Sequence, residues 1–135
     1  MPYVTNPELF SVRRSYAGLG LFTKVPFRKG DFVIEYTGEM ITSKEGDLRK
    51  SLYVFHVNSR WALDAAGKEH IARYINHSCE PNCKPEVRGK RVLIFAKRPI
   101  RPGEELSYNY GKEYFDEYIK PKGCKCPACQ RLRHR

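Results

Sequence analysis

The sequence lacks a long hydrophobic segment, since its longest uninterrupted apolar run is Val92–Ala96. A membrane-spanning helix needs about 20 apolar residues, so we expect no association with a membrane. Residues 1–6 lack the basic and then apolar order of a secretory signal, so we expect an intracellular protein. Repeats and low-complexity stretches are absent, and a content of 41% hydrophobic and 30% charged residues excludes a disordered chain.

Acidic residues are scarce relative to basic ones. The 135 residues include 25 Lys and Arg against 15 Asp and Glu, which gives a formal net charge of +10. Such an excess predicts attraction to polyanions. Contact with nucleic acid through a basic surface is therefore one interpretation, and an ordinary solvated surface is the other. The length predicts one domain, which buries roughly two thirds of the surface of the unfolded chain.

Short apolar runs between turn signals, spaced about every eight to twelve residues, predict a mostly β protein. The expected strands are Leu9–Val12, Leu19–Val25, Asp31–Tyr36, Tyr53–Val57, Trp61–Asp64, Arg91–Lys97 and Leu106–Tyr110. Thr42–Glu45 has the pattern of a capping box and predicts a short helix to about Lys50. We expect one helical turn over His70–Ile75, and a loop over the polar, proline-containing segment Asn76–Pro85.

Three of the five cysteines, Cys124, Cys126 and Cys129, lie within six residues. Disulfides are disfavoured without an export signal, so this density of thiols predicts a metal site, most commonly for zinc. An iron–sulfur cluster and a tail of unligated thiols are the alternatives. Tetrahedral zinc needs a fourth ligand. The candidates for it are Cys79, Cys83 and His134.

Four short sequence blocks precede the cysteine tail, and their order along the chain is informative. They are Gly18-Leu19-Gly20, Glu35–Glu39, Arg73–Asn82 and Gly103–Tyr110. Taken singly, each is an ordinary turn, strand or polar loop. In this order they closely resemble the SET-domain protein lysine methyltransferases, over about residues 9–129. The run Asn76-His77-Ser78-Cys79, followed by Pro81-Asn82, is the most specific part of the resemblance.

The resemblance implies a mostly β, β-clip-like SET fold of several small curved sheets, with short helices and a knot-like C-terminal threading. It implies a SET catalytic domain over residues 1–112 and a post-SET-like zinc-binding tail over residues 113–135. Cys79 would join Cys124, Cys126 and Cys129 on one zinc ion, although the tail spacing is shorter than the family's usual pattern. No cysteine-rich region precedes the domain, so we expect the catalytic unit alone. Substrate choice would then come from Ser43–Arg60 and the tail.

The activity that the resemblance implies is transfer of a methyl group from S-adenosylmethionine to a lysine ε-amine. Tyr110 would be the catalytic tyrosine, Tyr36 would lie beside the amine, and Tyr108 would limit the product to mono- or dimethyl-lysine. The residues implied in cofactor binding are Gly18, Leu19, Gly20, Tyr53, Arg73, Tyr74, Asn76 and His77.

The implied partner is a protein substrate, either a histone or another basic protein with a lysine-containing tail. We expect the protein in the nucleus and on chromosomes if its source has chromatin, and otherwise in the cytoplasm. Two rival interpretations are a catalytically silent SET-like module that binds protein or nucleic acid, and a small zinc-containing nucleic-acid binder. The sequence predicts no particular oligomeric state.

Overall fold

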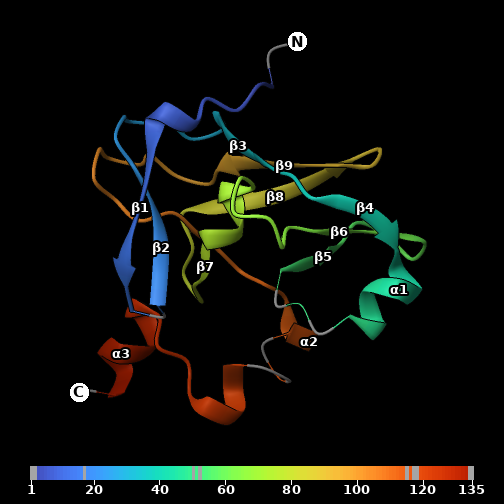
Figure 1. Cartoon of the computed structure of the whole chain (residues 1–135). Helices are drawn as coiled ribbons and strands as arrows, with labels where there is room; N and C mark the ends of the chain where they lie inside the picture. Colours follow the sequence, from blue (N-terminus) through green and yellow to red (C-terminus); the bar gives the residue numbers. More distant parts are fainter. Residues whose placement is uncertain are drawn as a thin grey trace.

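Most of the regular structure in the computed structural model is β (Figure 1). The structure describes residues 3–16, 18–49, 51, 53–114, 116 and 119–133. Its strands are β1 Phe10–Ser15, β2 Gly18–Thr23, β3 Phe32–Tyr36, β4 Glu39–Thr42, β5 Val54–His56, β6 Trp61–Asp64, β7 Asn76–His77, β8 Cys83–Arg88, β9 Arg91–Ala96 and β10 Ser107–Tyr108. Its helices are α1 Ser43–Leu48, α2 Lys112–Tyr114 and α3 Pro127–Arg133, with 3-10 turns η1 Pro7–Leu9, η2 Ile71–Tyr74 and η4 Lys120–Lys122. The prediction of a mostly β fold with few short helices is confirmed.

In the described part of the chain, the strands form small separate sheets. β1 and β2 make an antiparallel pair, and β7 and β10 make a parallel pair. The two larger sheets have the strand orders β3-β9-β8 and β4-β6-β5. No described helix has the length and apolar character needed to cross a membrane. The knot-like threading stays a prediction.

The core is built around β9, whose residues Val92–Ala96 are all buried. This strand lies between β3 and β8, and a short continuous apolar run is typical of such an enclosed position. Leu21 from β2, Ile34 from β3 and Ile75 after η2 are also almost fully buried in the same cluster. The core therefore fixes the strands from which the candidate site residues project.

Local sequence signals explain the elements around α1. The Thr42 hydroxyl accepts a hydrogen bond from the Glu45 N–H at 3.1 Å, so the predicted helix cap is present. The predicted hairpin of β5 and β6 is also present. Its turn is held by the Asn58 side chain, which accepts from the N–H groups of Arg60 and Trp61 at 2.8 Å each.

The predicted loop over Asn76–Pro85 is wrong at both ends. Asn76–His77 forms β7, because it pairs with β10, which lies far along the chain. β8 begins at Cys83 and includes Pro85. Proline is tolerated there because β8 is the edge strand of its sheet. β4 is a further strand that the sequence did not predict, and it is formed by pairing with β6.

Replacement of Ile94 tests where the core lies. This side chain is 0% exposed at the centre of β9, so Ile94→Ala is expected to lower the free energy of unfolding by about 2–5 kcal/mol. Val87 on the neighbouring β8 is 45% exposed, and Val87→Ala is expected to change the free energy of unfolding by less than about 1 kcal/mol. Urea denaturation measures both values, and equal losses would show that β9 is not the centre of the core.

Candidate active site

A row of aromatic rings crosses the middle of the molecule. Tyr36 from β3 lies 5.3 Å from Phe55 in β5, and Phe55 lies 6.3 Å from Tyr108 in β10, measured between ring centroids. Tyr110 lies 5.0 Å from Tyr108 on one side and 5.0 Å from Tyr114 on the other. The structure thus brings together the three tyrosines that the sequence singled out, although Tyr36 is far from the other two in the chain.

Two tyrosine hydroxyls in this row have defined hydrogen-bond partners. The Tyr36 hydroxyl donates to the Tyr53 carbonyl at 2.8 Å, and the Tyr110 hydroxyl donates to the Ile75 carbonyl. Burial raises the pKa of Tyr36, Tyr108 and Tyr110 above the usual value for tyrosine. Each therefore remains an uncharged phenol at neutral pH, which can donate a hydrogen bond but is not a ready base.

His77 connects the aromatic row to the rest of the site. Its ring centroid is 5.5 Å from that of Tyr110, and its Nδ1 atom accepts from the Tyr110 N–H at 3.1 Å. Burial lowers the pKa of His77, which agrees with a neutral ring whose Nδ1 is an acceptor. The Tyr16 hydroxyl donates to the His77 carbonyl at 2.7 Å. A hollow of about 220 Å³ is lined by His77, Cys79, Asn109 and Lys112.

Asn76, the residue before His77, holds the start of β2. Its side-chain amide donates to the Leu19 carbonyl at 3.0 Å and to Glu105 at 2.9 Å. The Gly18–Gly20 segment is therefore placed next to the His77 strand. Gly18 has φ of +96°, and a Cβ added to it would meet no atom within 4 Å. The space over this backbone is open, and the neighbouring Leu19 side chain is 49% exposed.

At Gly20, in contrast, there is no space for a side chain. A Cβ added there would lie 2.9 Å from the Ser15 Cβ and would overlap the Glu105 carboxylate. Glu105 accepts from the Ser15 hydroxyl at 2.6 Å. The small residue therefore makes room for an internal carboxylate that also binds Asn76.

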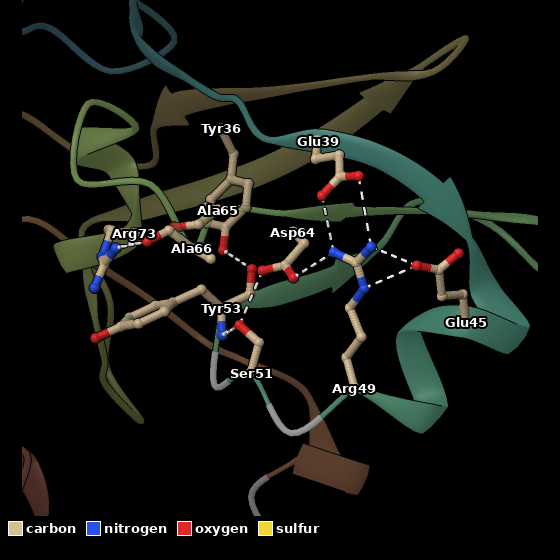
Figure 2. Close-up of polar contacts among 10 residues, drawn as sticks. All are labelled: Tyr36, Glu39, Glu45, Arg49, Ser51, Tyr53, Asp64, Ala65, Ala66 and Arg73. Atoms are coloured by element: carbon tan, nitrogen blue, oxygen red, sulfur yellow. Dashed lines mark hydrogen bonds and ion pairs between the residues drawn. The ribbon is translucent and has the colours of Figure 1, made fainter.

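Arg73 and Tyr74 lie on η2, and Arg73 connects this turn to Tyr53. The Arg73 guanidinium carbon is 3.8 Å from the centroid of the Tyr53 ring and 5.1 Å from that of Tyr74. Its Nη1 atom donates to the carbonyls of Ala65 and Ala66 (Figure 2). The Arg73 Nε atom is buried and has no hydrogen-bond partner among the described residues. A buried donor in this state fits a site that receives a polar ligand.

The four cysteines of the implied zinc site lie together. The sulfur atoms of Cys79, Cys124, Cys126 and Cys129 are all within 4.8 Å of one another. The Cys79 sulfur is 3.9 Å from that of Cys124 and 3.6 Å from that of Cys129. Four thiolates bound to one zinc ion at about 2.3 Å lie roughly 3.8 Å apart, so the donor set and its spacing fit zinc.

The thiols of the cluster differ in how readily they ionise, because burial raises the pKa of Cys79 above its usual value and that of Cys124 to about 11, whereas the pKa of Cys126 is lowered. Burial opposes ionisation of Cys126, but hydrogen bonds from the backbone of Cys79 and Cys129 prevail and lower its pKa to about 6. The thiolate is the form that binds metal. Cys83, an alternative fourth ligand, is buried in β8 and is not a member of this group of described residues. His134, the other alternative, lies outside the described residues.

Comparison with known protein families matches residues 18–111 to the SET domain. The chain belongs to the SET-domain family. The match spans β2 to Gly111 and so includes the aromatic row as far as Tyr110, together with Asn76 and His77. Cys124, Cys126 and Cys129 of the cysteine cluster follow the matched SET region.

Several proteins similar to this SET domain are named histone-lysine N-methyltransferases. Histone-lysine N-methyltransferase trr of Drosophila melanogaster is 38% identical over 137 residues, which covers 92% of this chain and 6% of the relative. Histone-lysine N-methyltransferase ATXR7 of Arabidopsis thaliana is 41% identical over 122 residues, or 81% of this chain and 8% of the relative. Histone-lysine N-methyltransferase set1 of Dictyostelium discoideum is 40% identical over 124 residues, which covers 82% of this chain and 8% of the relative. The chain thus spans less than a tenth of the length of these relatives.

Sequence reasoning missed several residues of the SET-domain site. Phe55 joins Tyr36 to Tyr108, but a single aromatic residue in a predicted strand gave no signal of this. Glu105 and Ser15 support Asn76 through contacts between residues distant in the chain. The adjacent Glu104 and Glu105 stand in the block that carried the resemblance, and this was the one available pointer to Glu105.

Zinc binding is tested by exchanging single cysteines. Cys126→Ser is expected to remove the ion, because it replaces one of four converging thiols, whereas Cys83→Ser is expected to retain it. Elemental analysis of the purified full chain, supplied with zinc, should find one ion per molecule for the unaltered protein and for the Cys83 variant. Loss of zinc from both variants, or its absence from the unaltered protein, would contradict this assignment.

Proposed function

We propose that this SET domain transfers a methyl group from S-adenosylmethionine to a lysine ε-amine of a histone or another basic protein. The observation that carries the proposal is the contact between the aromatic row and the His77 strand, which also holds the open backbone at Gly18 and Leu19. The relatives named as histone-lysine N-methyltransferases support the same activity. A histone substrate would place the protein in the nucleus.

The residues present fit the cofactor. The open space over Gly18 provides room, the exposed Leu19 provides an apolar contact, and the unpaired Arg73 Nε on η2 provides a free donor. When bound, S-adenosylmethionine supplies an electrophilic methyl carbon on a positively charged sulfur. Residues 113–135 would then form the zinc-binding tail, and the Cys79–His77 contact of 3.4 Å would connect the tail to the site.

The lysine amine must lose its proton before it can attack. A free lysine has a pKa of about 10.4, so deprotonation at pH 7 costs roughly 4–5 kcal/mol. Aromatic walls disfavour a charged ammonium because they replace water, and this lowers the cost. Ring faces also accommodate a methylated amine, and a neutral phenol can hold it by a hydrogen bond.

Tyr110 and Tyr36 are proposed to orient the amine. Each is a buried neutral phenol whose hydroxyl is fixed on a backbone carbonyl, of Ile75 and Tyr53 respectively. Since each hydroxyl already donates its proton to a carbonyl, its oxygen is left to accept from the amine N–H, and the nitrogen lone pair stays free to point at the methyl carbon. Alignment of the nitrogen with the methyl carbon at roughly 3–3.5 Å supplies on the order of 7–11 kcal/mol of the reduction in barrier.

The Tyr110 hydroxyl is tested by its removal. Tyr110→Phe is expected to lower kcat by on the order of 100-fold, because the amine loses its alignment, while calorimetry still detects cofactor binding. Tyr3→Phe is the matched control, since Tyr3 packs on Phe32 and Phe95 outside the site. Full activity of the Tyr110 variant in a methyl-transfer assay would refute the role.

Tyr108 is proposed to limit the product to mono- or dimethyl-lysine. Its ring is buried between Phe55 and Tyr110, so its hydroxyl occupies volume that a further methyl group needs. Tyr108→Phe is expected to extend the product to trimethyl-lysine, as measured by mass spectrometry. Trimethylation by the unaltered protein would overturn this proposal.

The activity itself is tested with a radiolabelled methyl donor, core histones and total cell protein. Label on histone lysine is the expected result. Saturable binding of the cofactor with no transfer to any protein would instead support a silent SET-like binding module. DNA affinity that falls steeply with salt, together with indifference to the cofactor, would support a nucleic-acid binder.

A further inference from the structure

Three carboxylates surround one guanidinium beside the aromatic row. Arg49, which ends α1, donates from Nη1 to Glu39 on β4 and to Asp64 on β6, at 2.9 Å each (Figure 2). It also binds Glu45, one turn earlier on the helix. The cluster therefore ties α1 to both neighbouring strands of the β4-β6-β5 sheet.

Asp64 is the enclosed member of this cluster. Its side chain is 4% exposed, whereas those of Glu39 and Glu45 are 64% and 51% exposed. Burial raises the pKa of Asp64, but hydrogen bonds from Arg49 and Ser51 outweigh this and keep the pKa below its usual value. A buried carboxylate of this kind is stable only while its donors, which include the Ala66 backbone, stay in place, so it fixes their positions.

Ser51 connects the Asp64 carboxylate to the backbone of Tyr53 by two hydrogen bonds. The Ser51 hydroxyl donates to Asp64 at 2.9 Å and accepts from the Tyr53 N–H at 3.1 Å. The Tyr53 carbonyl in turn accepts from the Ala65 N–H at 3.0 Å and from the Tyr36 hydroxyl at 2.8 Å. Figure 2 shows this series of contacts, which runs from Arg49 to the hydroxyl of Tyr36.

Tyr53 needs such support because it precedes β5 and lies outside regular structure. The direction of its carbonyl decides where the Tyr36 hydroxyl points. We propose that Asp64, with Ser51 and Arg49, forms a positioning cluster that aims the Tyr36 hydroxyl at the substrate amine. This role rests on the proposed function, because it concerns the alignment of the lysine that the SET domain methylates.

The direct test is a double-mutant cycle with Ser51→Ala and Tyr36→Phe. Ser51→Ala removes the bridge between Asp64 and the Tyr53 N–H, and is expected to lower kcat by on the order of tenfold, since small misplacements are costly in alignment. KM for the cofactor should change much less than kcat, because the Tyr53 ring also stacks on Arg73. In the Tyr36→Phe background, where no hydroxyl remains to be aimed, Ser51→Ala should have little further effect on kcat.

Two further variants separate positioning from folding. Ser51→Thr retains a hydroxyl and is expected to restore most of kcat. Ser11→Ala removes a hydroxyl from β1, away from the cluster, and is expected to leave kcat unchanged. Thermal unfolding of every variant identifies any that fails to fold. Hydrogen exchange at the Tyr53 amide should be faster in Ser51→Ala, and this readout needs no activity.

The outcomes distinguish the two proposals. No methyl transfer by the unaltered protein to any substrate would overturn the proposed function. An active unaltered protein in which the effects of Ser51→Ala and Tyr36→Phe multiply independently would overturn only the positioning role. Failure of Ser51→Thr to restore kcat, or an unchanged exchange rate at Tyr53, would overturn it as well.

Discussion

The parallel pairing of β7 with β10 is the contact on which the rest of the site depends. It sets Asn76 opposite Ser107, and His77 opposite Tyr108, although these residues come from separate parts of the chain. The Asn82 side chain secures the pairing by accepting from the Ser107 N–H at 2.9 Å and donating to the Glu105 carbonyl at 2.8 Å. Without this short pairing, the His77 region and the tyrosines would have no reason to meet.

The cysteine tail also helps to hold the His77 strand in place, through Tyr16. Tyr16, just after β1, packs on the cluster that contains Cys124 and Cys126, and its hydroxyl reaches the His77 carbonyl. Figure 1 shows α3 beside the end of β1 and the start of β2. The first hairpin, the His77 strand and the cysteine tail are therefore held on one another, and zinc would reinforce this arrangement.

The sequence allowed prediction of the elements that depend on local pattern. The apolar run of β9, the turn at Asn58 and the Thr42 cap all follow from neighbouring residues, and the structure has each of them. β7 was missed because two polar residues have no periodicity, and only their distant partner makes them a strand. Tyr36 and Tyr110 were found through resemblance to a family, not through periodicity.

The Arg49 cluster was missed for a related reason. Its Glu45–Arg49 pair is an ordinary surface pattern of a helix, but Glu39 and Asp64 lie on strands distant in the chain, and only the burial of Asp64 makes the set significant. Burial of a charge is a property of the packed sheet. The same holds for Glu105, whose partners Ser15 and Asn76 come from other elements.

The edge strand β8 has a consequence for association between molecules. An unpaired strand edge is a template on which another chain can add a strand and start aggregation. Pro85 has no N–H to offer such a chain, and the neighbouring Lys84, Glu86 and Arg88 place charges along the same edge. The edge is thus protected against intermolecular β-pairing.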